Sequence, residues 1–581
     1  MKTKSVILFV LTLLSAIVFF TNISFAQTQG ANDKQEWTGT TEQKVFGLMT
    51  VWSEAKYNFP WFDKLPDLDW DAKVTEYIPR VIAAQDIDAY YKVLMEFVTL
   101  LKDGHTNIWP PWFPFKQTDD LPAIEIQIVE NKYIIAHVGD TEENKNQNIF
   151  PGLEILEIDS NIPVEVYFKE NVLRYNTTGT ELGDQILVWS IFVGQSGTKL
   201  SLKVKDWNGT IRNVILTRNT IALGTPFLPQ FAMWNGFEKS IELKTLPGNI
   251  QYVCIPNFTN ESMVKEFKDM IDNLDSTKTR GMIIDLRYNS GGNDRNAKQM
   301  ISCLIDHPIN TPLLKIPQYI GAYRAWERET QLLETNDLII PRSQKKYLGP
   351  LVVLTGKGTA STAEDFAIEM QFSGRAILVG ERTPGSAGNP IHVSLPGGGT
   401  LRVATFRSYY PDGTEYMHDG VKPGVEVVTT QKNLYDGVEP IIEKGIEVIN
   451  NWTAFSKTTK KFKTSAVAGI SKILNHKSYA DVKSEIDDIV TRGSEYYFLE
   501  NEFINYGYDL IKNDRINDAA GIFKMTTELY PASWNAYDSY AEALMKKGEN
   551  EGAIENYKKS LKLNPKNKNG EDMLKSLNDT E

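Results

Sequence analysis

The sequence has few of the residues that build metal centres and disulfide frameworks. It contains two cysteines and six histidines among 581 residues, and neither a C-x-x-C nor an H-E-x-x-H motif occurs. We therefore predict no metal site and no cofactor. Cys254 and Cys303 lie in apolar surroundings, which predicts buried free thiols, with a single disulfide as the alternative.

Clustered positive charge and long apolar runs are also scarce. The chain carries 62 Lys and Arg against 74 Asp and Glu, with a formal net charge of −12 and no basic patch. Because binding nucleic acid requires clustered Lys and Arg, no nucleic-acid partner is expected. After residue 20, no apolar run is long enough to span a bilayer, which takes about 20 residues.

The one apolar run of note, residues 6–20, has the context of a secretory signal. Lys2 and Lys4 precede it, and residues 24–26 offer a small-x-small cleavage site. Residues 1–26 are therefore predicted to be a signal peptide, and the mature chain to be periplasmic or secreted with no stable membrane span. An uncleaved N-terminal anchor is the alternative.

Apolar periodicity divides the remaining chain. Residues 27–118 have helical spacing, with a capping box at Thr40 and a helix stop at Asp103. Residues 119–218 contain short alternating, β-branched runs that indicate a small, mainly β domain. Residues 219–430 contain short apolar runs that end in glycine turns and alternate with helix-like sequence, which indicates an α/β core around a buried sheet.

The C-terminal part repeats itself. After a helical connector over residues 431–500, residues 501–581 show matches at a 34-residue period, including Pro531 with Pro565 and Phe523 with Tyr557. This pattern resembles the tetratricopeptide (TPR) repeat. We expect either a groove that binds a protein partner or a helical cap on the core. The fold as a whole is predicted to be multidomain α+β.

The stretch GKGTASTAEDF, residues 356–366, is the main candidate for chemistry. A strand, a small-residue turn and a helix start place Ser361 at the end of a sheet, with the Thr362 amide and the helix dipole beside a developing oxyanion. Ser361 and Glu364 also form an S-x-x-E capping box, so Ser361 is either a nucleophile or a helix cap. The turn lacks G-x-S-x-G, which excludes an α/β-hydrolase elbow.

A serine nucleophile requires a base and oxyanion donors. His105 follows a helix stop and precedes an aromatic, proline-rich loop, which suits a side chain that points into a cleft; a loop histidine bonded to backbone is the alternative. In DLRYNSGGN, residues 285–293, Gly291 and Gly292 follow a buried strand. Their amides either approach a ligand closely or form a simple turn.

Together these motifs resemble the serine peptidase family of C-terminal processing (tail-specific) proteases, tricorn core proteases and interphotoreceptor retinoid-binding protein. Residues 151–163 are similar to the family's PDZ-like stretch, DLRYNSGG to its D-L-R-x-N-x-G-G, and residues 358–385 to its nucleophile segment. The resemblance implies an N-terminal helical region, a PDZ-like domain over residues 119–218 and a ClpP/crotonase-like catalytic core, ahead of the TPR-like repeats.

The resemblance also implies site residues. The tail-specific branch uses a Ser/Lys pair, but the matching position here is Ser386, and no lysine lies between Ser361 and Lys422. The tricorn-like branch uses a serine, a histidine and a glutamate. That scheme implies Ser361 as nucleophile and His105 as general base.

Three further roles follow from the same scheme. Glu415 is the implied third catalytic group, with Asp419 as its rival. The serine that precedes the histidine in the tricorn-like branch is Gly104 here. The implied oxyanion donors are the amides of Thr362, Gly291 and Gly292.

The implied function is a secreted or periplasmic serine endopeptidase that cleaves peptides or protein tails through an acyl-enzyme. Its expected partners are a peptide or protein substrate and a protein that binds the TPR-like repeats. Two alternatives stay open. The family includes a retinoid carrier, so the chain can be a carrier of a hydrophobic ligand, or it can be a PDZ/TPR peptide-binding scaffold around an inert core.

Overall fold

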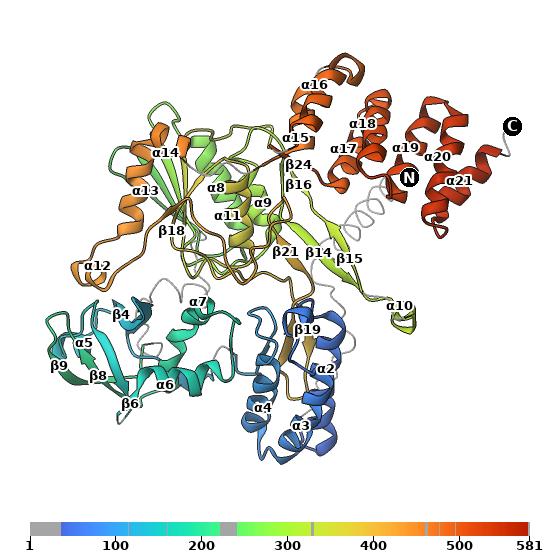
Figure 1. Cartoon of the computed structure of the whole chain (residues 1–581). Helices are drawn as coiled ribbons and strands as arrows, with labels where there is room; N and C mark the ends of the chain where they lie inside the picture. The colour runs from blue at the N-terminus through green and yellow to red at the C-terminus, as the bar shows by residue number, and fades with distance from the viewer. Residues whose placement is uncertain are drawn as a thin grey trace, which may run out of the picture.

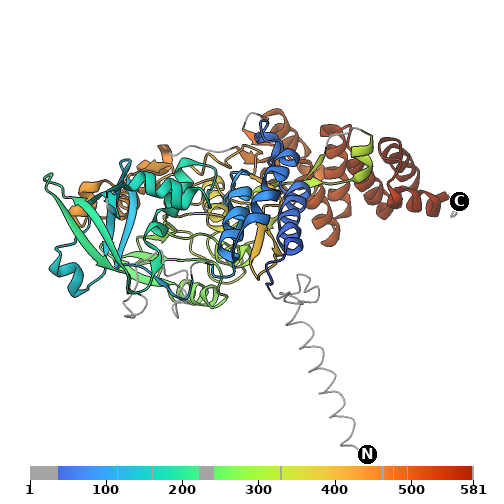
Figure 2. The ribbon, with the colours of Figure 1, turned by 90° about the horizontal axis from the view of Figure 1, so that it is seen from below.

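A computed structural model describes residues 37–113, 116–159, 161–220, 241–326, 330–458, 463–475, 477–493 and 495–578. The predicted signal peptide, residues 1–26, lies outside these ranges. Figure 1 shows a central sheet with helices on both faces, N-terminal helices and a β-rich segment below it, and an array of C-terminal helices. Figure 2 confirms that the β-rich segment and the C-terminal helices lie at opposite ends of the molecule. The fold is multidomain α+β.

The N-terminal helices begin where capping residues predict them. They are α2 (Thr41–Asn58), α3 (Trp70–Ala83) and α4 (Ile87–Thr99). The side chains of Thr40, Asp69 and Asp86 each accept a hydrogen bond from a first-turn amide, which satisfies a donor that the helix leaves unpaired. Their apolar faces join the main hydrophobic core. After α4, the chain passes through His105 into the short strand β1 (Asn107–Trp109).

The β-rich segment is a six-stranded sheet with the order β3–β4–β5–β8–β9, and β6 pairs with β5. Its strands are β3 (Ile124–Val129), β4 (Lys132–Val138), β5 (Glu154–Ile158), β6 (Ile162–Pro163), β8 (Lys199–Lys205) and β9 (Ile211–Thr217). Along β8, buried apolar residues alternate with exposed or partly buried ones, as expected for a sheet with one solvated face. The edge strand β3 lies beside η3 (Gln185–Phe192).

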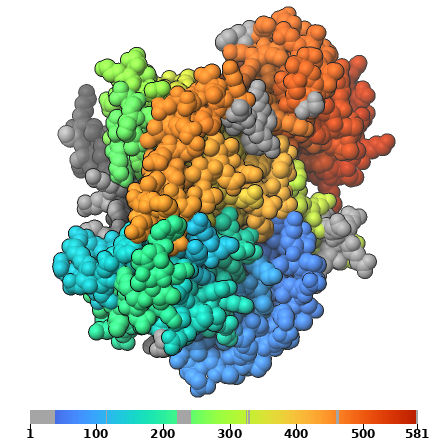
Figure 3. Space-filling view, turned by 60° about the vertical axis from the view of Figure 1, so that its left-hand side comes forward, coloured from blue at the N-terminus to red at the C-terminus, as the bar shows by residue number. Residues whose placement is uncertain are grey.

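This sheet docks on the core through α12 (Gln431–Asp436). The Gln431 side chain donates to the Gly152 carbonyl at 2.9 Å and accepts from Lys132 Nζ at 3.1 Å. Figure 3 shows the β-rich segment packed against this part of the chain and against the N-terminal helices. The segment is therefore held at a fixed place beside the central sheet.

The central sheet has six strands in the order β10–β11–β12–β17–β18–β22. They are β10 (Glu242–Leu246), β11 (Ile250–Cys254), β12 (Gly281–Asp285), β17 (Leu351–Thr355), β18 (Ile377–Gly380) and β22 (Val425–Glu426). Neighbouring strands run parallel, except for β10 with β11. The three apolar runs that predict buried strands therefore become the adjacent strands β12, β17 and β18.

Helices cover both faces of the central sheet. Ile283, Val352 and Leu354 pack against α13 (Pro440–Asn450) on one face. Ile284 and Val353 point to the other face, which is covered by α8 (Ser262–Asn273), α9 (Asp294–Ile301) and α11 (Thr362–Phe372). Because the strands are parallel, the loops after β12 and β17 meet at the same edge of the sheet, where α/β proteins place their ligands.

The 34-residue period in the sequence is a period of helix pairs. The C-terminal helices are α15 (Ala466–Leu474), α16 (Tyr479–Thr491), α17 (Glu500–Lys512), α18 (Ile516–Leu529), α19 (Trp534–Lys547), α20 (Asn550–Leu563) and α21 (Lys568–Asn578). α19 begins 34 residues after α17, and α20 begins 34 residues after α18. A Cβ at Gly507 would lie 2.3 Å from the Phe523 ring, so close helix packing requires glycine there.

Cys254 and Cys303 are free thiols. Among the helices that the structure describes, none combines the length and the apolar character that crossing a membrane requires.

Candidate active site

Ser361 lies in a strained turn between β17 and α11. Its backbone has φ 56° and ψ −128°, and its side chain makes no capping hydrogen bond. A residue other than glycine at positive φ costs about 1–3 kcal/mol and persists only where its surroundings hold it. Here the Ser361 amide donates to the Ser386 carbonyl at 2.8 Å, and the Glu364 amide donates to the Ser361 carbonyl at 2.7 Å. Ser361 therefore stands at the N-cap position without capping the helix through its side chain, and a strained strand–turn–helix junction is the geometry of a nucleophile turn.

Glu364, the other residue of the predicted capping box, binds the turn of residues 383–386 through its carboxylate. Its carboxylate is fully buried and accepts from the amides of Gly385 and Ser386, each at 2.8 Å, and from the Thr383 hydroxyl. Burial raises the pKa of Glu364 to about 7, although these hydrogen bonds favour the charged form. Glu364 therefore fixes the turn of residues 383–386 against the start of α11.

Ser386 connects the nucleophile to the histidine. Its carbonyl accepts from the Ser361 amide, and its Oγ lies 3.0 Å from Nδ1 of His105. A Cβ at Gly104 would lie 2.8 Å from the Ser386 Oγ. The Ser386 hydroxyl thus occupies the place beside His105 that a side chain at residue 104 would need.

His105 is buried and neutral. Burial, together with the nearby positive charge of Arg402, lowers the pKa of His105 to about 3. The carboxylate of Asp103, which is also buried, accepts a hydrogen bond from the His105 backbone amide rather than from its ring. Strand pairing of β1 with β20 (Thr400–Val403) holds the turn that contains His105. A neutral imidazole in a fixed turn can accept a proton.

The two glycines after β12 have different roles. The Gly291 amide donates to Asn289 Oδ1 at 2.8 Å, so in this structure it is already engaged, and its role as an oxyanion donor stays a prediction. A Cβ at Gly291 would lie 2.8 Å from the Ser361 Cβ and 3.0 Å from the Thr362 nitrogen, so glycine is needed for this close approach. Among the described residues, the Gly292 and Thr362 amides have no acceptor. These two N–H groups are therefore free to donate to a ligand in the described part of the chain.

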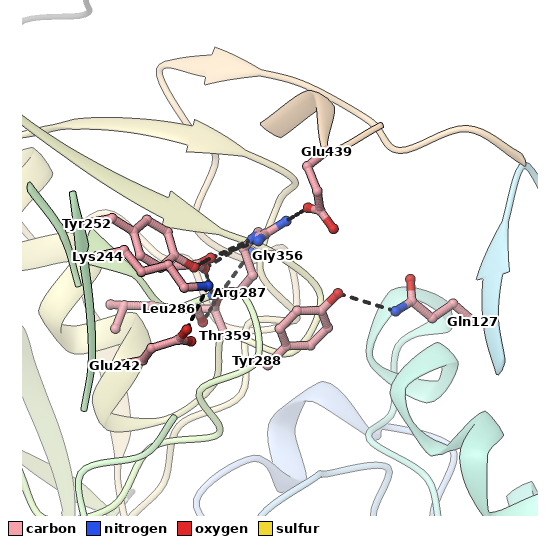
Figure 4. Close-up of polar contacts among 11 residues, drawn as sticks. Gln127, Glu242, Lys244, Tyr252, Leu286, Arg287, Tyr288, Gly356, Thr359 and Glu439 are labelled. Carbon is pink, nitrogen blue, oxygen red and sulfur yellow. Dashed lines mark hydrogen bonds and ion pairs between the residues drawn. The ribbon is translucent and has the colours of Figure 1, made fainter. Parts of the chain in front are cut away.

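The loop that carries the glycines is braced at its base (Figure 4). Arg287 donates to both carboxylate oxygens of Asp285, at 3.0 and 2.8 Å, and to Glu439 at 2.8 Å. The Tyr288 hydroxyl lies 3.4 Å from Nε2 of Gln127 on β3. These contacts connect the loop to α13 and to the β-rich sheet, so the geometry near Ser361 depends on both.

The structure does not bring the predicted third group to His105. Glu415 forms a partly exposed ion pair with Lys64 at 3.2 Å, and Asp419 is exposed. The ring of His105 instead contacts the Ser386 hydroxyl. Sequence reasoning noticed residue 386 only because it replaces the lysine of a related branch, and that substitution was the available signal for its role.

Within the described ranges, no three His, Cys, Asp or Glu side chains are grouped to hold a metal ion.

Comparisons with known proteins match the core. Residues 249–427 match the profile of peptidase family S41. The carboxy-terminal processing protease CtpA of Bacillus subtilis is 28% identical over 234 residues, which cover 40% of this chain and 43% of that protein. Carboxyl-terminal-processing peptidase 3, chloroplastic, of Arabidopsis thaliana is 23% identical over 67% of this chain and 70% of its own length. The chain thus spans less than half the length of the first relative.

Solved structures agree on the fold. The crystal structure of mature CPAF has a TM-score of 0.56 and 17% sequence identity, and the match covers 72% of this chain and 98% of that one. A second CPAF structure, in complex with lactacystin, gives a TM-score of 0.55. At this identity the likeness concerns the fold alone. The sequence match to peptidase family S41 and the strained Ser361 turn lie in the same segment, residues 249–427, so this core is similar to that family in the part of the chain that contains Ser361.

Proposed function

We propose that the protein is a secreted or periplasmic serine endopeptidase that cleaves peptides or protein tails. The observation that carries this proposal is the uncapped Ser361 at the start of α11, connected through Ser386 to the buried, neutral His105. Relatives named C-terminal processing proteases support the substrate class. The signal-like residues 1–26 support the compartment.

The proposed reaction is acyl transfer. In the proposed tautomer, His105 keeps its proton on Nδ1 and donates a hydrogen bond from it to the Ser386 Oγ, which leaves the lone pair on Nε2. Nε2 takes the Ser361 proton as the Ser361 Oγ attacks the substrate carbonyl. The amides of Thr362 and Gly292 hold the oxyanion. His105 then protonates the leaving amine and activates water, which releases the acyl group from Ser361.

We infer that the substrate reaches this site between the β-rich sheet and the core. A cavity of about 270 Å³ is lined there by apolar side chains of β3 and η3 and by the loops that contain Ser290 and Gly358. β3 is an edge strand, and an extended peptide can pair with such an edge. We infer that the sheet has the PDZ-like role of holding a peptide, and that the C-terminal helix pairs bind a protein partner as TPR-like repeats.

Hydrolysis of an unfolded protein tests the proposed function. Wild-type protein should cleave denatured casein, with the new termini visible by mass spectrometry, and Ser361→Ala should not. Equal cleavage by both proteins, or by neither, would contradict the proposal.

Replacing Ser386 by alanine should lower kcat by about 10–100-fold with little change in KM, because His105 loses the partner that sets its tautomer. The geometry offers a rescue. A serine at residue 104 would place its side chain where the Ser386 hydroxyl now lies. The double variant Gly104→Ser, Ser386→Ala should therefore recover part of the lost kcat, whereas Gly104→Ala, Ser386→Ala should not. Equal kcat in the two double variants would refute the positioning role.

Glu415→Gln should change kcat/KM by less than about threefold, because exposed ion pairs contribute little and Glu415 pairs with Lys64 rather than His105. Lys64→Gln is the matched control and should behave alike. A loss of about a hundredfold or more in Glu415→Gln alone would restore Glu415 as a catalytic residue.

A further inference from the structure

A second cavity opens beside the oxyanion donors and is not used by the proposed mechanism. It has a volume of about 90 Å³, well above the ~10–15 Å³ that a single water needs. α9, α11 and β14 (Leu313–Gln318) surround it. Thr362 forms part of its wall. A substrate residue whose carbonyl oxygen binds the Thr362 amide therefore has its side chain within reach of this cavity.

The cavity is strongly acidic. Asp294, Asp337, Asp365 and Glu369 line it, and Lys298 is the cation among its lining residues. Lys298 lies 3.2 Å from Asp337 and so pairs with a carboxylate whose side chain is 76% exposed. Asp294 accepts a hydrogen bond from the Thr362 hydroxyl. Asp365 and Glu369 are left facing the cavity without a cation bound to them.

Among the carboxylates that line the cavity, Glu369 gives the strongest indication that the cavity binds a ligand. Its side chain is 3% exposed, and among the described residues no donor forms a hydrogen bond to its carboxylate. It lies four residues after Asp365 on α11, where two like charges destabilise a helix. Burial and the Asp365 charge raise the pKa of Glu369 well above its ordinary value. A buried carboxylate without a partner is costly and is typical of a functional site rather than of a structural one.

The walls suit a long side chain with a cationic end. The apolar residues that line the cavity are Ala297, Pro312, Leu314 and Phe406. Lys and Arg bury an aliphatic stem along such surfaces and direct their charge to a carboxylate. Among the described side chains, no three His, Cys, Asp or Glu are grouped to hold a metal ion. An organic cation therefore fits the cavity better than a metal ion.

We propose that this cavity binds a lysine or arginine side chain of the substrate residue that carries the scissile carbonyl, with Glu369 and Asp365 holding its cationic group. This specificity role rests on the proposed peptidase function. The proposed substrates are therefore peptides with a lysine or arginine at the residue that carries the scissile carbonyl.

The test compares peptides that differ only at that residue: arginine, lysine and the uncharged norleucine. Wild type should prefer arginine or lysine over norleucine by about tenfold or more in kcat/KM. Glu369→Gln should lower this preference at least about tenfold, and Asp365→Asn should lower it in the same direction. Glu96→Gln is the matched control, because it removes a buried carboxylate on α4 that already pairs with Arg80 and Arg174, and it should leave the preference unchanged.

Benzamidine provides a second readout that does not depend on the peptide chosen. This small planar cation should slow fluorophosphonate labelling of Ser361 in wild type and have no effect on Glu369→Gln. If wild type cleaves the norleucine peptide as well as the basic ones and benzamidine has no effect, the specificity proposal is wrong while the peptidase stands. If no peptide is cleaved and Ser361 is not labelled, the peptidase function fails and the specificity proposal falls with it.

Discussion

Ser361→Ala is expected to abolish turnover, with a fall in kcat of about 10⁴–10⁶-fold, the range seen when the nucleophile of a serine peptidase is removed. The physical reason is that the Ser361 Oγ is the atom that forms the acyl-enzyme. Its hydroxyl makes no hydrogen bond among the described residues, so its loss leaves the turn intact. The melting temperature should therefore change little. Steady-state hydrolysis and thermal unfolding on the same preparations measure both quantities.

The control is Ser471→Ala, which removes a partly buried hydroxyl that donates to a helix carbonyl on α15. It should keep full activity. Turnover by Ser361→Ala above about a tenth of wild type would mean that the nucleophile lies elsewhere.

His105→Asn should lower kcat by about 10³-fold or more, because asparagine can fill the site but cannot take the Ser361 proton. Its matched control is His307→Asn, since His307 is an exposed histidine that pairs with Asp306 on the surface. The loss should appear in kcat rather than in KM, because His105 acts on the reacting atoms and not on substrate binding. Comparable activity in the two variants would exclude His105 as the base.

The environment of His105 also predicts its titration. Burial disfavours the imidazolium, so the pKa of His105 lies near 3 rather than near the ordinary 6.5. The ring should stay neutral at every pH above about 5. NMR of ¹³C-labelled histidine, assigned with His105→Asn, measures this directly. In the unfolded chain the same ring binds a proton below about pH 6.5, so it should reduce the stability of the fold as the pH falls through that value.

Much of the core was predictable because it depends on local pattern. The runs at 282–286, 351–354 and 376–379 are apolar throughout, and strands buried on both faces have this composition. They became β12, β17 and β18. The 34-residue period likewise gave the helix pairs, since each repeat packs on the next through matched small and aromatic positions. The capping side chain at Thr40 marked a helix start.

The site was predictable only in part, because hydrogen bonds over long sequence distances decide it. Glu415 forms an ion pair with Lys64, which is 351 residues away in the sequence, rather than contacting His105. The Gly291 amide, a predicted oxyanion donor, instead forms a local hydrogen bond to Asn289 in this structure. Ser386 was missed because a hydroxyl has no catalytic pattern of its own, and its position beside His105 arises only when β1 pairs with β20.

The central claim is that Ser361 is a nucleophile activated by His105. The most direct test is labelling with a fluorophosphonate probe, followed by mass spectrometry of the labelled peptide. The account predicts one modification, on Ser361, that is absent in Ser361→Ala and much slower in His105→Asn. A folded wild-type protein that takes no label, or takes it on another residue, would contradict the account.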